Sequence, residues 1–418
     1  MKPRLPIVPP TSAYVHIPFC RRRCFYCDFP ISVVGNLRRG ETSLTVETYV
    51  DVLCKEIAVT AGENLAFNPP LETVFFGGGT PSLLSVAQLD QILAALDQHF
   101  GIAASAEISM EMDPGTFSLE HLKGYLGAGV NRISLGVQAL DDAVLERCGR
   151  FHRGADVHQA VDWLHQVAMA NWSLDLISGL PYQTLQDWEQ GLRQATDLQP
   201  HHLAIYDLTL EPQTVFAQRY QPGNAPLPTD DQTAAMYRSA QGYLTSQGYD
   251  HYEVSNYAQP GHRCRHNLTY WRNQPYYGFG MGATSYTGHQ RVSRPRTLTT
   301  YQQWVEEFST TMGCHATLST PPDEQLLERL MVGLRLQEGI AGEELRSLCD
   351  APTWERLYQR LQPHIQTGWV VVESQGDLAT VPSLEALQQL RLTDPEGFLF
   401  SNVVLVDCFR LFPGLVTA

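Results

Sequence analysis

The sequence predicts an α/β fold: an incomplete (β/α)6 barrel followed by a small, mainly helical, winged-helix-like C-terminal domain. Short runs rich in Val, Ile and Leu alternate with longer helical patterns through the first half of the chain. Such alternation is typical of a parallel sheet with helical crossovers. Six such units precede about residue 210, which favours an incomplete barrel over an open doubly wound sheet. Beyond residue 322 the pattern changes to helices and a hairpin.

The strands and helices of the barrel follow one another along the chain. Ser85 and Ser118 stand where helix N-caps are wanted, because a serine hydroxyl can accept from free backbone N–H groups. The expected strands are Ala13–Ile17, Thr73–Phe76, Glu107–Met112, Arg132–Val137, Ser173–Ile177 and Leu203–Leu208. The expected helices are Val46–Glu63, Ala87–Phe100, Leu119–Leu126, Asp142–Arg147, Ala155–Ala168 and Leu185–Leu198.

The second half of the chain begins with a linker rich in Pro and Gly, Gln221–Asp231, and a helix over Gln232–Ser246. After the block Val254–Val305, the runs DEQLLERLMVGLRL, EELRSL and TWERLYQRLQPHI predict three helices, and GWVVVES with GDLATV predicts a hairpin. We therefore expect a barrel at 1–225, a linker helix and Arg/aromatic segment at 226–305, and a winged-helix-like domain at 306–418.

Composition limits the classes of partner. The chain has 418 residues, Lys+Arg 29 against Asp+Glu 44, and a net charge of −15, which argues against nucleic acid because phosphate binding needs a basic surface. No apolar run reaches the ~18 residues of a membrane span. The start, MKPRLPIVPPTS, lacks the apolar core of a signal peptide. We expect a cytoplasmic protein, with peripheral membrane association left open.

Three of the nine cysteines, Cys20, Cys24 and Cys27, lie within one short loop after the first expected strand. Iron–sulfur clusters are held by cysteine thiolates, commonly four. A loop with three leaves one iron of a 4Fe–4S cluster open, as catalytic metal sites keep a position for substrate. The alternative is structural zinc, which needs a fourth ligand; His16 is near, but only a bend in the strand would bring it in.

The run YVHIPFC followed by CxxxCxxC resembles the signature of the radical S-adenosylmethionine (SAM) superfamily. The resemblance implies a 4Fe–4S cluster whose open iron is chelated by SAM, which the reduced cluster cleaves to a 5′-deoxyadenosyl radical. Nearly the whole chain resembles the coproporphyrinogen dehydrogenase group. The matching segments are YVHIPFC, FFGGGTPS, MEMDPGT, RISLGVQ, DLISGLP and the C-terminal helical domain.

A cofactor pocket is expected at the carboxyl ends of the strands, where barrels place their chemistry. Gly77–Pro81 follows the second strand, and glycines let backbone amides approach a ligand closely. Glu111 and Asp113 alternate with methionines and so point to one side of a strand. They either face a cofactor or form salt bridges to Arg132 or Arg150. The resemblance implies SAM contacts from Tyr14, Tyr26, Gly78, Gly79, Thr80, Glu111, Gln138, Arg150, Asp175 and, less securely, Thr209.

One position departs from the dehydrogenases. Their motif resembles CxxxCxxCxC, and Phe29 stands here in place of the fourth cysteine. This departure, together with the run His266-Asn-Leu-Thr-Tyr-Trp271, resembles the haem-chaperone branch of the group, whose HNxxYW element is implicated in haem handling. The resemblance therefore implies haem as a further ligand and puts decarboxylation of coproporphyrinogen in doubt.

The block Val254–Val305 supports a flat ring with carboxylates as its ligand. It contains six arginines and no Asp, Glu or Lys. Arginine forks pair with propionates, and aromatic faces suit a porphyrin. His266 is the candidate iron ligand and Cys264 the second. The alternatives are that His266 packs in a turn against the barrel, and that the aromatic side chains are core between domains.

Three functions remain open at this point. The first is a haem chaperone that passes haem to acceptor haemoproteins, respiratory ones among the options. The second is an oxygen-independent coproporphyrinogen III dehydrogenase, which would decarboxylate two propionates to give protoporphyrinogen IX. The third is a radical SAM enzyme acting on another substrate. Phe29 and the HNLTYW run favour the first.

Overall fold

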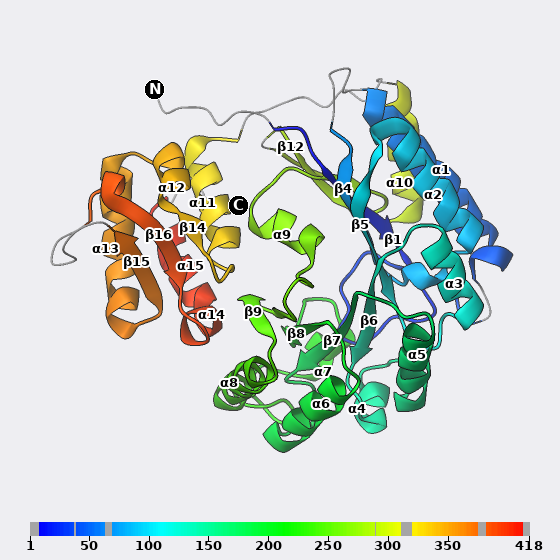
Figure 1. Cartoon of the computed structure of the whole chain (residues 1–418), viewed down its shortest axis with the longest axis horizontal. Coiled ribbons are helices and arrows are strands. Elements are labelled where there is room, and N and C mark those ends of the chain that lie inside the picture. The colour runs from blue at the N-terminus through cyan, green and yellow to red at the C-terminus, as the bar shows by residue number, and fades with distance from the viewer. Residues whose placement is uncertain are drawn as a thin grey trace.

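The computed structural model describes residues 8–36, 39–62, 69–288, 290–310, 320–374 and 382–412. A nine-stranded sheet, in the order β11-β1-β4-β5-β6-β7-β8-β10-β9, curves around the centre of the larger domain (Figure 1). All six expected strands form and pair in parallel with their neighbours, so the predicted incomplete barrel is confirmed. They are β1 (Ser12–Ile17), β4 (Leu71–Gly78), β5 (Ile102–Met112), β6 (Arg132–Gln138), β7 (Trp172–Ser178) and β8 (His202–Asp207).

The helices between these strands cover the outer face of the sheet, as Figure 1 shows. Each expected helix forms with ends close to those predicted, because its apolar residues recur at helical spacing and bury one face. The helices are α1 (Leu44–Gly62), α2 (Val86–Phe100), α3 (Leu119–Gly127), α4 (Asp142–Arg147), α5 (Gly154–Gln166) and α6 (Leu185–Asp197).

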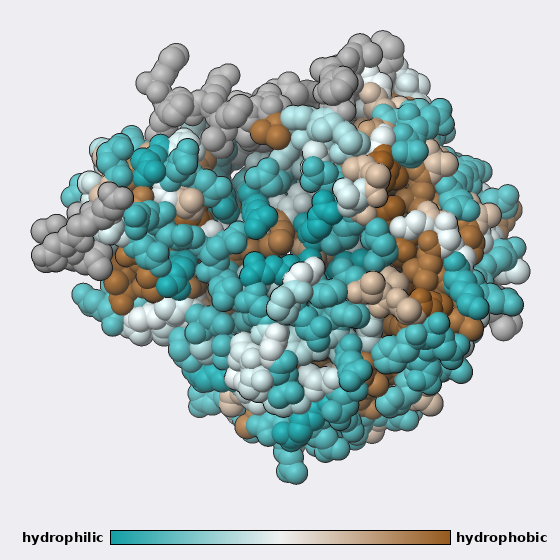
Figure 2. Space-filling model, viewed as in Figure 1, coloured by the Kyte–Doolittle hydropathy of each residue, from teal (hydrophilic) through white to brown (hydrophobic). Residues whose placement is uncertain are grey.

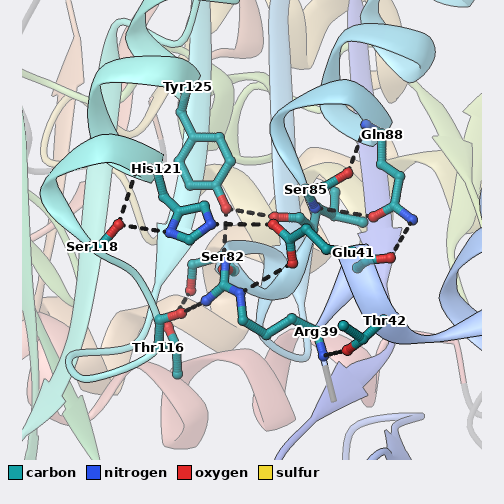
Figure 3. Close-up of polar contacts among 12 residues, drawn as sticks. Arg39, Glu41, Thr42, Ser82, Ser85, Gln88, Thr116, Ser118, His121 and Tyr125 are labelled. Atoms are coloured by element: carbon teal, nitrogen blue, oxygen red, sulfur yellow. Dashed lines mark hydrogen bonds and ion pairs between the residues drawn. The ribbon is translucent and has the colours of Figure 1, made fainter. Parts of the chain in front are cut away.

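The two predicted helix caps are confirmed (Figure 3). The Ser85 hydroxyl accepts from the Gln88 N–H at 3.1 Å, and the Gln88 side chain accepts from the Ser85 N–H at 3.0 Å. This reciprocal capping box satisfies two free donors at the start of α2. The Ser118 hydroxyl accepts from the His121 N–H at the start of α3. Tyr125 of α3 donates to two carbonyls of the loop before α2, which fixes the two helices to each other.

The segment expected as a linker and a separate Arg/aromatic region contributes strands to both edges of the sheet. β10 and β9 extend the β8 edge antiparallel, and β11 pairs in parallel with β1 at the opposite edge. The predicted helix after the linker is present. The boundary expected at residues 305 and 306 falls inside α10, which packs on α1. The elements are α7 (Val215–Arg219), α8 (Asp230–Ser246), β9 (Asp250–Glu253), β10 (Asn256–Ala258), α9 (Arg265–Trp271), β11 (Tyr277–Phe279), β12 (Thr284–Thr287), β13 (Gln290–Ser293) and α10 (Leu298–Thr310).

The helix α9 connects the two edges of the sheet across the open side of the incomplete barrel (Figure 1). Its Thr269 hydroxyl lies 3.1 Å from that of Ser12, at the start of β1. Its His266 ring lies 2.8 Å from the Thr73 hydroxyl, near the start of β4. The HNLTYW run therefore forms a plug at the amino-terminal ends of the strands, opposite the cysteine loop.

The C-terminal domain has the predicted three helices and a small sheet of order β14-β16-β15. Of the two strands of the predicted hairpin, GWVVVES forms β15, whereas GDLATV lies outside the described residues. β15 pairs with β16. The apolar run Phe398–Phe412 supplies α14 and α15, whose Phe398, Val404 and Cys408 enter this domain's core. The elements are α11 (Pro322–Gly333), β14 (Ile340–Ala341), α12 (Gly342–Leu348), α13 (Ala351–Thr367), β15 (Val370–Ser374), β16 (Leu387–Leu392), α14 (Glu396–Leu399) and α15 (Ser401–Phe409).

The surface view in Figure 2 is mostly hydrophilic, with apolar side chains gathered in patches on the side of α2 and α3. Among the described residues, no helix combines the length and the apolar character that a bilayer crossing needs.

Candidate functional site

The three-cysteine loop opens onto a cavity of about 360 Å³ at the carboxyl ends of the barrel strands. Cys20 ends the short strand β2 (Phe19–Cys20), which pairs with β3 (Ser32–Val33) and holds the loop against the barrel. The Thr80 hydroxyl lies 3.6 Å from the Cys20 sulfur, and the Arg150 guanidinium lies 3.5 Å from that of Cys24. The loop therefore lies directly beside the side chains expected to bind SAM.

The donors fit an iron–sulfur cluster better than a zinc ion. Each cysteine of a cluster binds a different iron, so the thiols surround a cube and need not converge on one point. In the part of the chain that the structure describes, no three His, Cys, Asp or Glu side chains converge on a single metal ion. The His16 ring is engaged by the Tyr14 hydroxyl at 3.0 Å and the Pro30 carbonyl at 2.9 Å. Burial lowers the pKa of His16 to about 4.

Burial of the cysteines matters for metal loading. Desolvation raises the pKa of the Cys20 thiol to about 12 and also raises the pKa of Cys27. A thiol in such surroundings stays protonated near neutral pH until a metal replaces its proton. The loop is thus set up to release protons when a cluster binds.

The glycine loop after β4 needs glycine for two reasons. Gly78 has φ of +106°, where a side chain is strained, and an added Cβ would overlap the His16 ring. Its backbone N–H donates to the Glu111 carboxylate at 3.0 Å. The loop and the third strand are therefore joined by one hydrogen bond at the wall of the cavity.

Two half-buried carboxylates of this cavity have raised pKa values. Desolvation raises the pKa of Glu111 to about 8, opposed by the hydrogen bond from Gly78, and raises the pKa of Asp175 to about 6. Asp175 accepts from the Ser134 hydroxyl at 2.8 Å and from the Ser173 hydroxyl at 3.4 Å. Both groups could therefore exchange hydrogen bonds with ribose hydroxyls or an ammonium group near neutral pH.

The two acids on one side of β5 have different partners. The Asp113 carboxylate accepts from the Arg150 guanidinium at 2.5 Å, which is the salt bridge considered from the sequence. Arg150 also donates to the Gly136 carbonyl at 2.6 Å. Glu111 forms no such pair in the described part of the chain, so for Glu111 the salt-bridge alternative is wrong. The sequence predicts that Arg150 pairs with the carboxylate of SAM. In the structure its guanidinium pairs with Asp113 and lies beside the cysteine loop.

The structure brings most of the expected SAM contacts to one cavity. Tyr14 instead lines a second, deeper cavity, and Thr209 is exposed and lines neither. Sequence reasoning missed Ile177 and Tyr206, although Ile177 follows Asp175 at the two-residue period of the strand. The expected residues that line the first cavity are Cys20, Cys24, Tyr26, Cys27, Gly78, Gly79, Thr80, Glu111, Gln138, Arg150 and Asp175.

Both nitrogens of the His266 ring are hydrogen-bonded, and the side chain is buried. Its two nitrogens lie 2.8 Å from the Thr73 and Tyr270 hydroxyls, its ring stacks on Phe75, and its side chain has no exposed surface. Burial lowers its pKa to about 3. The alternative in which this histidine packs against the barrel therefore describes the structure, and neither nitrogen is open to a haem iron in this state. Cys264 is buried as well.

The arginines of the Val254–Val305 block have acidic partners from other segments. Five of the six arginines pair with an acid that lies outside the block. The absence of acids within the block therefore did not reveal these five pairs. Arg296 donates to the Asp28 carbonyl instead. The pairs are Arg263–Asp250, Arg265–Glu72, Arg272–Glu338, Arg291–Glu328 and the buried Arg294–Glu56.

A three-cysteine loop beside a glycine turn, at the carboxyl ends of a parallel barrel, defines a radical SAM protein. The comparisons agree: residues 14–195 match the Radical SAM superfamily, and residues 320–379 match the HemN C-terminal domain. At 47% identity over 408 residues, the chain is similar to the haem chaperone HemW of Synechocystis, with 96% of each chain covered. The chain belongs to the HemW family.

Other relatives and a solved structure agree with this assignment. The haem chaperone HemW of Escherichia coli is 39% identical over 69% of this chain and 72% of its own. The mouse mitochondrial radical S-adenosyl methionine domain-containing protein 1 is 31% identical over 91% of this chain and 86% of its own. Coproporphyrinogen III oxidase (HemN) from Escherichia coli superposes with a TM-score of 0.77 at 23% identity, covering 96% of this chain and 90% of HemN. This likeness shows the shared fold.

Proposed function

We propose that this protein is a haem chaperone: it binds haem and transfers it to acceptor haemoproteins, while a 4Fe–4S cluster and SAM occupy the barrel. The observation that carries the proposal is the near full-length similarity to proteins named haem chaperone. Phe29 supports it, because the position where the dehydrogenases carry a fourth cysteine has no thiol here and its ring is 55% exposed at the rim of the cavity.

In this proposal Cys20, Cys24 and Cys27 hold the cluster. The bound cofactor pair supplies one-electron chemistry when the cluster is reduced. Gly78 and Gly79 let backbone approach the cofactor, Glu111 and Asp175 offer hydrogen bonds, and the pair of Asp113 with Arg150 fixes the guanidinium beside Cys24. Coproporphyrinogen oxidase activity is not part of the proposal.

Two surfaces are candidates for the haem position. His266 remains the ligand proposed from the sequence, and the block at residues 226–305 the proposed porphyrin-binding segment. Ligation by His266 requires one of two hydrogen bonds to break: that between the ring and Thr73 of the barrel, or that between the ring and Tyr270 within α9. An open surface lies instead at the rim of the cavity, where Phe29 and Phe151 are exposed and the Arg22 guanidinium lies 5.3 Å from the Phe151 ring. That surface offers apolar contact and a cation for a propionate.

Haem titration of matched variants discriminates between the two positions. Changing His266 to Ala should shift the Soret band if the histidine binds iron. Changing Arg22 to Ala together with Phe29 to Ala should weaken haem affinity with an unchanged band position if haem lies at the rim. Wild-type protein that fails to take up haem at all would contradict the chaperone proposal.

The decisive functional experiment is an anaerobic turnover assay on protein with a spectroscopically confirmed cluster. Coproporphyrinogen III, SAM and a low-potential reductant are supplied, and porphyrin products and 5′-deoxyadenosine are quantified. The proposal predicts no stoichiometric decarboxylated product, and transfer of bound haem to an apo-haemoprotein in a separate assay. Stoichiometric protoporphyrinogen would overturn the proposal and make Phe29 a tolerated departure in a dehydrogenase.

A further inference from the structure

A second cavity of about 170 Å³ lies inside the barrel, between the cofactor cavity and the plug helix α9. Its walls come from inward-facing residues of the six parallel strands, from β10 and from α9. It shares Glu111, Asp175 and Tyr206 with the cofactor cavity. Anything bound in it would therefore lie next to the cofactor.

The guanidinium of Arg132 lines this cavity without a partner. Arg132 is 2% exposed, its Nε atom is fully buried, and its side chain forms no hydrogen bond or ion pair within the described part of the chain. The other buried arginines differ: Arg294 pairs with Glu56, and Arg150 with Asp113. A buried charge without hydrogen bonds is strongly unfavourable, so an acceptor is expected to meet Arg132.

The two acids that attract Arg132 are already engaged elsewhere. Glu107 and Asp175 attract Arg132 at longer range, but neither forms an ion pair with it in the described structure. Glu107 accepts the backbone N–H groups of Arg265 and His266, both at 3.0 Å. Asp175 accepts from two serine hydroxyls. The N–H donors on the two Nη atoms of Arg132 are thus left for a molecule in the cavity.

A second residue on the cavity wall also has an unsatisfied polar atom. Asn256 lines the cavity, and its side-chain oxygen is fully buried without a hydrogen-bond partner. An occupant with two anionic oxygens would pair with the guanidinium fork of Arg132. Bicarbonate, acetate and other small carboxylates have two such oxygens. The cavity is too small for a porphyrin or for SAM, so neither explains it.

Charge in the cavity is compatible with an anion. The pKa of Glu111 is raised to about 8, so this carboxyl group is mostly neutral at pH 7. Asp175 keeps its charge more readily but is bound by Ser134 and Ser173. Arg132 is the one arginine or lysine on the cavity wall.

We propose that Arg132 binds one small carboxylate anion, of the size of bicarbonate or acetate, inside the barrel and beside the cofactor cavity. The site rests on this chain's own residues and is independent of haem binding. Its role would be to hold a small acid within reach of the cofactor cavity or to complete the charge balance of the barrel interior.

The test uses the full-length protein and three probes: bicarbonate, acetate and chloride. Isothermal titration and thermal unfolding are expected to show one saturable site for the carboxylates, with chloride weaker. Arg132→Gln should lose about tenfold or more in affinity, since a hydrogen bond to a charged group is worth that much. Arg294→Gln is the matched control: it removes a buried arginine that is already paired and should leave anion affinity unchanged.

A second variant protects the test against misfolding of Arg132→Gln. Ala204 lines the cavity, and Ala204→Val fills part of it without changing charge. This variant should also lose saturable carboxylate binding. Absence of saturable binding in the wild type, or undiminished binding in both variants, would overturn the proposal, as would a crystal structure grown in bicarbonate with water alone beside Arg132. Haem titration of the same proteins reports separately on the chaperone function.

Discussion

The Glu107 carboxylate accepts the backbone N–H of His266 at 3.0 Å, joining two residues that lie far apart in the chain. Glu107 also accepts the N–H of Arg265 at 3.0 Å, so a strand residue caps the plug helix α9. A carboxylate at a helix N-terminus satisfies free N–H groups and meets the positive end of the helix dipole. The HNLTYW run is therefore held in the barrel by a charged group of the third strand.

Replacing Glu107 with Ala should destabilise the protein by about 2–3 kcal/mol, because two buried N–H groups lose a charged acceptor. Urea unfolding measures the change. Glu72, which pairs with Arg265 on the surface at 3.7 Å, provides the control. Glu72→Ala should alter the free energy of unfolding by at most about 0.5 kcal/mol. Equal losses in the two variants would show that α9 is not held by Glu107.

Changing Cys20, Cys24 and Cys27 together to Ala should abolish cluster binding, because no thiolate remains in the loop to ligate iron. Iron and sulfide analysis after anaerobic reconstitution, with the visible spectrum, gives the readout. Cys54 on α1 is the control, since it lies away from the cavity and Cys54→Ala should reconstitute normally. Stoichiometric iron and sulfide in the triple variant would make the cluster assignment wrong.

Glu111 should make stability depend on pH. Its folded-state pKa of about 8 lies above the ordinary value of 4.5, so the folded protein holds a proton that the unfolded chain releases. Stability from this group is therefore complete at low pH and falls as the pH rises from 4.5 towards 8. Glu111→Gln cannot ionise.

The contribution of Glu111 is isolated by measuring the free energy of unfolding of the wild type and of Glu111→Gln, both without cluster, from about pH 5 to about pH 9. The difference between the two proteins at each pH is the quantity of interest. The wild type should lose several kcal/mol relative to the variant across this range. Parallel profiles of the two proteins would show that Glu111 ionises normally.

Gly78→Ala should impair binding of SAM and lower stability, because the methyl group would overlap the His16 ring and the backbone has φ of +106°. Equilibrium dialysis with SAM and thermal unfolding measure the two effects. Gly191→Ala in α6 is the matched control: an added Cβ meets no atom within 4 Å, so this change should stabilise the helix by up to about 1 kcal/mol. Normal SAM affinity in Gly78→Ala would show that the glycine loop is not part of the cofactor site.

The parts of the fold that sequence predicts well are local. The strand and helix periods are visible within single segments, and Cys20, Cys24 and Cys27 belong to one loop. The pairing of β11 with β1 and the capping of α9 by Glu107 join segments far apart in the chain, and no local pattern signals them. The arginine block suggests a surplus of positive charge for the same reason. Arg294, for example, pairs with Glu56 of α1, which lies far from the block in the sequence.

The pairing of β11 with β1 also has a consequence for biosynthesis. The outer edge of β1 is covered by Tyr277–Phe279, which leave the ribosome long after Ser12–Ile17. Until then the nascent chain carries a strand with unpaired N–H and C=O groups along one edge, the feature that drives edge-to-edge aggregation. Truncated chains that stop before β11 should therefore be poorly soluble, and the sheet can be completed only late in translation.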